Sequence, residues 1–260
     1  MERMPVESLH KGLTVLELLT VEAGENGLSL ADIAHRMGYK RTTAHNLLKT
    51  LVLCGYAVNN GGGHYRPGSK IGQLIRNLRV GRPLPAAWLQ MLGDLATDLN
   101  ESIVLTTLAD NSRRVLARAS GRHLVQVDTE RLEDEHRRIW ETVTGRVLAA
   151  FAPTDVLDRL VEKDGFPGKT WRGISTRNRL EQALEGVRNA GYAEAHEPAI
   201  ASLAIPVRER DLLLGAIGTH LPEYRWEQHD HTNLIDAMRR TAARLAHLWH
   251  GETNIPVPST

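Results

Sequence analysis

The sequence has 260 residues, of which 42% are hydrophobic and 24% charged, so it is long enough for two domains with real cores. No run of about 18 apolar residues indicates a membrane span, and the charged N-terminus lacks the apolar region of a signal peptide. The single cysteine, Cys54, excludes an internal disulfide and fits a reducing cytoplasm, and we expect it to be a small core residue.

The net charge of +1 conceals an asymmetry between two parts of the chain. Residues 28–80 include eight basic residues and one acidic residue, Asp32, which leaves this segment at +7 and the remainder at −6. A basic block beside an acidic remainder predicts that one end of the protein meets a polyanion and that the other end does not.

The first helix is predicted over residues 8–21, with Ser8 as its N-cap. Leu9, Leu13 and Leu16 recur on one side of this helix as its expected buried stripe, with Val15 and Leu19 beside it. Two glycines then interrupt the helical pattern.

A second and a third helix are predicted on either side of a tight turn. The second begins with the capping-box-like pattern of residues 29–32 and ends at Gly38, and a three-residue turn leads into the third. One side of the third helix is apolar and consists of Ala44, Leu47, Leu48 and Leu51. Its other side carries hydroxyl, imidazole, amide and ammonium groups but no carboxylate, and such groups bond to bases and phosphates in a major groove. The pattern predicts a helix-turn-helix.

A β-hairpin is predicted directly after the third helix. Residues 56–58 and 64–66 are its strands, and the Asn- and Gly-rich residues 59–63 supply the positive φ angles of its tip. A hairpin at this place is the wing of a winged helix, or alternatively a cover over the helices. Residues 69–80 then predict a linker helix with Ile71, Leu74, Ile75 and Leu78 inward, and two prolines at 83 and 85 mark the domain boundary.

The remaining chain mixes helices and strands in the pattern of an α+β sheet domain. Helices are expected at 86–99, 140–151, 154–163, 176–190 and 226–250. Strands are expected at 102–108, 114–119, 123–129, 191–193, 203–208 and 212–219. The charged residues 131–138 are expected to form a solvated loop.

Polar side chains of the third helix are the candidates for reading DNA. Asn bonds bidentately to adenine, Thr offers a hydroxyl or a methyl group, and Lys suits guanine or phosphate. We expect the groove to be entered by Thr42, Thr43, His45, Asn46 and Lys49. Phosphate contacts are expected from Arg41, from the helix start at Ser29, and from His64 and Arg66 of the wing.

No motif for catalysis or for metal binding accompanies these residues. The sequence lacks a Gly-x-Ser-x-Gly elbow, a phosphate-cradling loop and a His-Glu-x-x-His pair. His229, Asp230 and His231 form the closest cluster, but neighbouring residues at a helix start point apart. We therefore expect no metal, no cofactor and no enzymatic activity.

Several stretches resemble the isocitrate-lyase-regulator (IclR) family of transcriptional regulators. Residues 8–19 are similar to the family's opening helix, and residues 28–34 with 42–48 resemble its helix-turn-helix. Residues 55–56 and 63–68 are similar to its wing. Residues 191–193 with Glu197, and residues 203–207, resemble the closing strands of its effector domain. The resemblance spans essentially the whole chain and is most specific in its N-terminal part.

The resemblance implies an α+β protein with an N-terminal winged helix-turn-helix domain over residues 1–68 and a linker helix over residues 69–82. It also implies a GAF/PAS-like α+β effector-binding domain over residues 83–252 and a flexible tail over residues 253–260. Members of the family form dimers through their DNA-binding domains, are often paired into tetramers, and act on promoters as repressors or activators.

In such domains the effector pocket lies between the sheet and the segments over it. The resemblance implies effector contacts from Trp140, Thr142 and Thr144 on the covering segment, and from Ile200, Ser202, Gly218 and His220 on the strands. Trp140 and His220 favour an aromatic or larger ligand over glyoxylate-like acids, and the effector is expected to be an aromatic compound or an organic acid.

The main hypothesis is a cytoplasmic transcriptional regulator that binds a palindromic duplex operator as a dimer or tetramer and responds to a small-molecule effector. One alternative is an enzyme whose C-terminal domain turns over its ligand, with a helical N-terminus that serves assembly. A second alternative is an architectural DNA-binding protein without a ligand. Salt-dependent DNA binding separates the regulator from the enzyme, and a ligand-induced melting shift separates it from the architectural protein.

Overall fold

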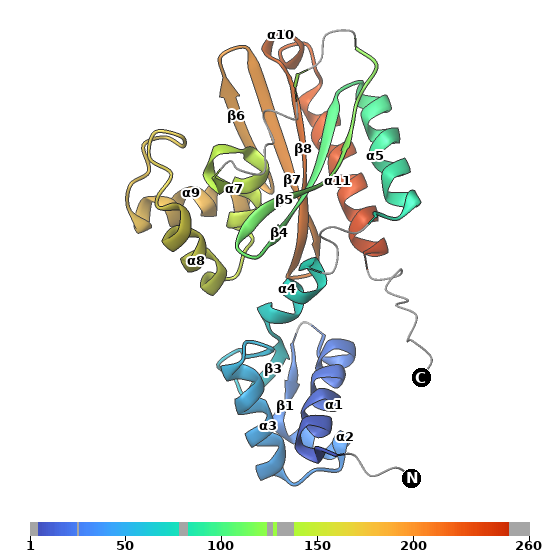
Figure 1. Ribbon diagram of the computed structural model, residues 1–260, viewed down its shortest axis with the longest axis vertical. Helices are drawn as coiled ribbons and strands as arrows, with labels where there is room; N and C mark the ends of the chain where they lie inside the picture. Colours follow the sequence, from blue (N-terminus) through green and yellow to red (C-terminus); the bar gives the residue numbers. More distant parts are fainter. Residues whose placement is uncertain (1–4, 25, 78–82, 124–126, 129–137, 250–260) are drawn as a thin grey trace. The chain divides into compact units, whose positions relative to one another are not determined.

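The chain folds into two compact units that divide between Ile75 and Arg76. Figure 1 shows the computed structural model, which describes residues 5–24, 26–77, 83–123, 127–128 and 138–249. Each unit has its own sheet and its own buried core, so each is described by itself.

The first unit is a winged helix-turn-helix. Its helices are α1 (Glu7–Glu22), α2 (Leu30–Met37), α3 (Arg41–Leu53) and the start of α4 (Ser69–Asn77). Its antiparallel sheet has the order β1-β3-β2, from β1 (Leu28–Ser29), β2 (Ala57–Asn59) and β3 (His64–Pro67). The predicted helix-turn-helix and hairpin are therefore confirmed, and the structure adds the short strand β1.

Local chemistry fixes the turn between α2 and α3. The Ser29 hydroxyl accepts from the Asp32 amide while the Asp32 carboxylate accepts from the Ser29 amide, which is the expected capping box. Gly38 ends α2 in the left-handed conformation with a φ of 65°, where a glycine has no Cβ penalty. Ala44 and Leu48 are fully buried, so the apolar side of α3 faces the core as predicted.

Several predictions for the first unit are wrong. Helix α1 begins at Glu7 with Val6 at its N-cap, so Ser8 does not cap it. Leu9 is 59% exposed and Leu13 51% exposed; the buried residues of α1 are Val15, Leu18 and Leu19. The two stripes lie side by side on one helix, and only the packing of α1 against α3 and β3 selects between them.

Two further residues are more exposed than the sequence suggested. Cys54 is exposed because it follows the last turn of α3 as its C-cap, beyond the buried side of that helix. Leu74 of α4 is 47% exposed, and Leu78 of the predicted linker helix lies outside the described residues.

The second unit is built on a five-stranded antiparallel sheet with the order β5-β4-β8-β7-β6. Its strands are β4 (Ser102–Ala109), β5 (Ser112–Ala119), β6 (Ala193–Glu197), β7 (Ile200–Glu209) and β8 (Leu212–Pro222). Its helices are α5 (Ala86–Leu99), η1 (Ile139–Glu141), α7 (Val143–Ala150), α8 (Thr154–Asp164), α9 (Arg177–Ala190), α10 (Glu223–Trp226) and α11 (His231–Leu248).

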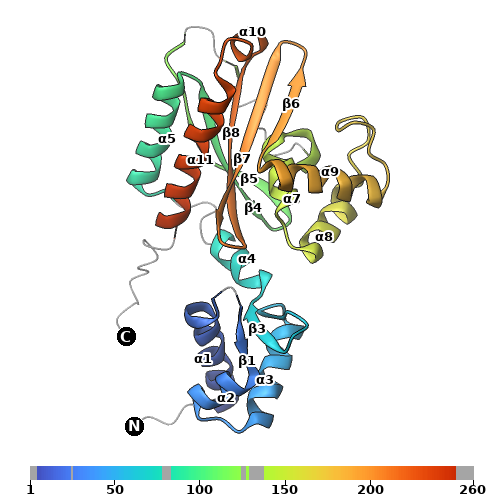
Figure 2. The ribbon, with the colours of Figure 1, turned by 180° about the vertical axis from the view of Figure 1, so that it is seen from behind.

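Helices cover both faces of this sheet, as Figures 1 and 2 show. Helix α7 packs on β7 and β8 with α9 and α8 around it, and α5 and α11 cover the other face. On that second face the rings of Trp88 and Trp249 lie 4.5 Å apart between centroids. The expected α+β sheet domain is confirmed.

The structure changes several expected boundaries in this unit. The predicted helix over 140–151 is a 3-10 turn followed by α7, and the predicted last helix is the separate helices α10 and α11. Gly191 is the left-handed C-cap of α9, so the strand after it begins at Ala193. Of the predicted strand 123–129, the described residues His123, Val127 and Asp128 are not in a strand; the other four, the expected loop residues 131–137 and the tail 253–260 lie outside the described residues.

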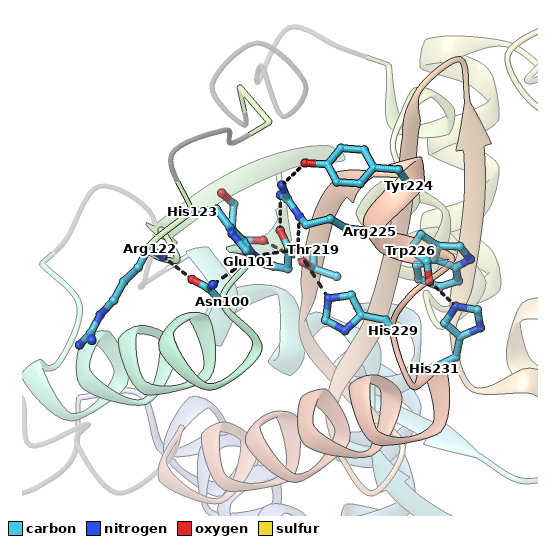
Figure 3. A network of polar contacts seen from close by, with 11 residues as sticks. Asn100, Glu101, Arg122, His123, Thr219, Tyr224, Arg225, Trp226, His229 and His231 are labelled. Carbon is cyan, nitrogen blue, oxygen red and sulfur yellow. Dashed lines mark hydrogen bonds and ion pairs between the residues drawn. The ribbon is translucent and has the colours of Figure 1, made fainter.

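A buried ion pair closes one end of the sheet (Figure 3). Glu101, which is 2% exposed, precedes β4 and accepts from Arg225 Nε at 2.6 Å and from Nη2 at 2.8 Å. His229 Nε2 lies 3.5 Å and His123 Nε2 4.0 Å from the same carboxylate oxygen. The bidentate pair joins the segment between α5 and β4 to α10 in the described part of the chain.

Candidate DNA-binding surface and effector cavity

The outer face of α3 presents polar side chains without a carboxylate. Thr43 is half-buried, and the remaining predicted residues of this helix are exposed, namely Arg41, Thr42, His45, Asn46 and Lys49. The burial of Ala44 and Leu48 fixes the rotation of the helix, so the predicted set is directed away from the core of the unit. The face offers hydrogen-bond donors and positive charge, which is the chemistry that base edges and phosphates accept.

Ser29 has a structural role, because it is the N-cap of α2. Its hydroxyl caps α2 and also donates to Asp32 Oδ2 at 2.6 Å. The hydrogen bonds from the Ser29 hydroxyl and backbone amide lower the pKa of Asp32, so a carboxylate occupies the helix start. The negative charge of Asp32 would repel a phosphate at this helix start. Ser29 therefore serves mainly as the N-cap of α2.

The two predicted wing residues are half-buried on β3. His64 pairs with Ser29 in the β1–β3 ladder, and its Nδ1 lies 3.1 Å from the Gly62 carbonyl. The Arg66 side chain passes Gly27, where a Cβ would come within 3.0 Å of the Arg66 Cγ. The wing is exposed along its tip, Asn60 to Gly63, and at Val58 and Asn59 of β2 and Pro67 of β3.

In the second unit a small cavity lies where α7 begins over the sheet. Its volume is about 20 Å³, and it is lined by Glu141, Thr142, Val143, Ala195, Glu197, Ile200, Ser202 and His220. The lining comes from η1, the start of α7, and strands β6, β7 and β8. Inside it Ser202 Oγ and His220 Nδ1 are 2.8 Å apart, across the β7–β8 ladder.

Four predicted effector residues meet at this cavity: Thr142, Ile200, Ser202 and His220. The other three are packed elsewhere. Trp140 is 1% exposed, and its Nε1 donates to the Gly165 carbonyl at 2.8 Å. Gly218 lies under Thr144, because a Cβ on this glycine would come within 2.5 Å of the Thr144 methyl group. Gly218 thus allows α7 to approach β8 closely, and the indole of Trp140 is core.

The predicted list left out four residues of the lining, namely Glu141, Val143, Ala195 and Glu197. The sequence predicted a strand that stopped at Ala193, whereas β6 continues to Glu197. Alternate residues of a strand share a face, so Ala195 and Glu197 would have followed from Ala193 if the strand had been extended.

Arg146 lies on α7, the helix whose start lines the cavity, and it is buried. Burial lowers the pKa of Arg146 to about 10, and the charge of Glu197 partly opposes this shift. The guanidinium donates to the carbonyls of Trp140 and Thr170 and lies 5.2 Å from the centre of the Trp171 ring. These contacts hold the cation within the helical layer over the sheet.

Among the described residues, no group of three or more His, Cys, Asp or Glu side chains is placed to hold a metal ion. His229 approaches Glu101, whereas His231 Nε2 lies 2.8 Å from the Trp226 carbonyl, so these two neighbours point apart (Figure 3). In the part of the chain that the structure describes, no helix combines the length and apolar character needed to cross a bilayer.

Two family models match the chain along most of its length. The IclR helix-turn-helix domain matches residues 8–61, and the bacterial transcriptional regulator IclR C-terminal domain matches residues 81–247. The glycerol operon regulatory protein of Streptomyces coelicolor is 28% identical over 82% of this chain and 84% of that protein. The regulator XynR of Escherichia coli is 29% identical over 78% of this chain and 81% of its own.

Solved structures show the same fold. The Thermotoga maritima IclR structure is similar with a TM-score of 0.52 and 17% identity, and the match covers 94% of this chain and 98% of that one. The IclR-type regulator of Alicyclobacillus acidocaldarius matches with a TM-score of 0.53 and 21% identity, over 95% of this chain and 99% of that one. The exposed face of α3, the wing and the matching sequence models agree: the chain belongs to the IclR family of bacterial transcriptional regulators, which are not enzymes.

Proposed function

We propose that this regulator reads a palindromic promoter operator through α3, as a dimer or tetramer, and that a small molecule in its C-terminal domain changes its affinity for the operator. The observation that carries the proposal is the outer face of α3, where Thr42, His45, Asn46 and Lys49 are exposed together. Asn46 and Thr42 contact the bases, and Lys49 and Arg41 contact phosphates. The site of action is the bacterial cytoplasm, where promoter DNA lies.

An exposed apolar stripe on α1 supports the dimer. Val6, Leu9 and Leu13 are 55%, 59% and 51% exposed, and the two leucines are one helical turn apart. Three neighbouring apolar side chains in water favour burial against another surface. A second copy of α1 offers the same stripe, and a two-fold contact of this kind matches the symmetry of a palindromic operator.

The effector site is the cavity between α7 and strands β6, β7 and β8. A ligand that binds there more tightly in one arrangement of the dimer shifts the population toward that arrangement and so changes the affinity for DNA.

The test is binding to duplex DNA over a range of salt concentrations. Fragments from the flanks of the protein's own gene are compared with shuffled fragments of equal length. The logarithm of the binding constant is expected to fall linearly with the logarithm of the salt concentration, with a slope of about −0.9 for each phosphate neutralised. Binding that is absent at low salt, or that does not change with salt, would overturn the proposal.

A further inference from the structure

The cavity proposed above as the effector site has an acidic lining. Glu141 and Glu197 contribute carboxylates, and of the eight described residues that line it none is a lysine or an arginine. The other polar groups are the hydroxyls of Thr142 and Ser202 and the imidazole of His220. The inference that follows rests on the proposed function and concerns the charge of the molecule that this cavity accepts.

The two carboxylates differ in their partners. Glu141 accepts from Arg138 Nε at 2.9 Å, and this arginine is half exposed, so the charge of Glu141 is compensated toward solvent. Glu197 forms no ion pair with any described residue. The charge of Glu197 reaches Arg146, but that guanidinium is already bonded to two carbonyl oxygens in the helical layer. Glu197 is therefore the carboxylate that is available to a ligand.

The size of the cavity limits what enters it. A volume of about 20 Å³ is close to the space that one water-sized group needs. An engineered cavity that accepts benzene measures about 150 Å³, so an aromatic ring has no room in this state. A ligand with a carboxylate would bring a second negative charge next to Glu197, and Coulomb repulsion between the two carboxylates opposes its binding. An ammonium group is about as large as a water molecule and has only hydrogen-bond donors.

We propose that this cavity binds the ammonium group of a small primary amine, with Glu197 as the counter-ion and the Ser202 hydroxyl as an acceptor. Ser202 Oγ lies 2.8 Å from His220 Nδ1, and a hydroxyl that donates to this nitrogen keeps lone pairs for the ligand. Val143 and Ile200 are the apolar part of the lining, and because the cavity has room for the ammonium group alone, the carbon chain of the amine extends out of it toward solvent.

The experiment uses three probes with one skeleton and different charge: 2-aminoethanol, ethane-1,2-diol and glycolate. Each is titrated into the full-length protein by calorimetry, and the melting temperature is followed in parallel. 2-Aminoethanol is expected to bind about tenfold more tightly than either of the others, since its ammonium gains a hydrogen bond to a charged group. Glycolate or the diol binding as tightly as the amine, or no binding by any probe, would overturn the assignment.

Matched variants locate the binding. Glu197→Gln keeps the shape and removes the charge, so it is expected to weaken 2-aminoethanol binding about tenfold. Glu141→Gln is expected to have a smaller effect because Glu141 is already paired with Arg138. Glu162→Gln, on the exposed side of α8, is the control with the same charge change and no effect on binding. Amine binding that survives Glu197→Gln unchanged places the amine elsewhere and rejects the inference.

Operator binding is measured on the same samples. A protein that binds its operator but prefers glycolate remains a regulator with a different effector class. A protein that binds the amine through Glu197 but does not bind duplex DNA retains this inference and rejects the proposed function.

Discussion

Asn46 is the side chain on α3 best suited to distinguish one base from another, because its amide donates and accepts at the same time. Asn46→Ala is expected to reduce the preference for the operator over random DNA by about 1–3 kcal/mol. Competition binding with operator and shuffled duplexes measures this preference directly.

Lys49→Ala is the companion variant, because a lysine that contacts phosphate positions the protein without reading sequence. It is expected to weaken binding to both duplexes by the same factor and to reduce the salt slope by about one unit. If Asn46→Ala lowered both affinities equally, Asn46 would be a backbone contact and base reading would belong to other residues of the helix.

Gly145 holds the start of α7 against the turn before it. A Cβ at this position would lie 1.9 Å from the Ile139 carbonyl oxygen, much closer than a Cβ and a non-bonded atom approach one another. Gly145→Ala is therefore expected to lower the free energy of unfolding by about 1–3 kcal/mol, the usual cost of overpacking. Urea unfolding of the purified protein provides the measurement.

Gly186 is a control of the same chemistry in α9, where a Cβ meets nothing within 4 Å. Gly186→Ala is expected to raise the free energy of unfolding by about 0.5–1 kcal/mol, because alanine restricts the unfolded chain and favours a helix. Equal effects of the two substitutions would mean that the turn at Ile139 moves aside without cost.

Among the elements, α10 is attached to the sheet by the buried pair of Glu101 and Arg225 (Figure 3). Glu101→Gln removes one charge and leaves Arg225, which is 7% exposed, without its counter-ion. Breaking a buried pair in this way is expected to cost about 3–5 kcal/mol of unfolding free energy. Thermal and urea unfolding check the size of the loss.

Asp236→Asn is the matched control on α11. Asp236 pairs with Arg239 at 3.6 Å on the surface, where both side chains are about half exposed. Exposed pairs contribute roughly 0–1 kcal/mol, so this variant is expected to unfold almost like the wild type. A loss for Glu101→Gln as small as the control's would show that water replaces the pair at the end of the sheet.

For the whole molecule, the dimer contact is predicted to lie on α1. Leu13→Glu places a charge in the exposed apolar stripe and removes a leucine whose burial stabilises a contact by roughly 1.5–3 kcal/mol. The variant is expected to sediment as a lighter species than the wild type and to lose affinity for a palindromic operator. Analytical ultracentrifugation and operator binding measure the two effects.

Val21→Glu tests whether any added charge on α1 has the same result. Val21 is 82% exposed near the end of the helix, and it points about a quarter turn away from Leu13. This variant is expected to keep the assembly of the wild type. If Leu13→Glu also kept it, the dimer contact would lie on another surface.

Local sequence patterns allowed the first unit, the winged helix-turn-helix, to be predicted from the sequence. A capping Ser and Asp, a left-handed Gly38 and an Asn- and Gly-rich hairpin tip each act within a few residues, so their structural consequences do not depend on distant packing. The exposed polar side of α3 followed in the same way from the apolar positions 44 and 48. The assignment of Asn46 to base reading stays a prediction.

The predictions that were wrong concern residues whose burial depends on contacts between helices and strands. The spacing of Leu9 and Leu13 is that of a buried stripe, and only the direction in which α3 and β3 approach α1 shows that Val15 and Leu19 are the core instead. The resemblance predicts Trp140 in the pocket, but its indole N–H donates to the carbonyl of Gly165, a residue 25 positions later in the chain. Such a partner has no local signal in the sequence.

The sequence alone determined that a winged helix-turn-helix domain carries a basic, carboxylate-free third helix, because helix caps, glycine turns and side-chain periodicity act over short distances. Only the tertiary structure decided which apolar side of α1 remains exposed and which further side chains complete the lining of the proposed effector cavity. Glu197 lies on β6 and His220 on β8, and both line the cavity because β7 pairs with each of these strands in one sheet. The charge of that cavity is a property of strand register, which the order of residues does not state.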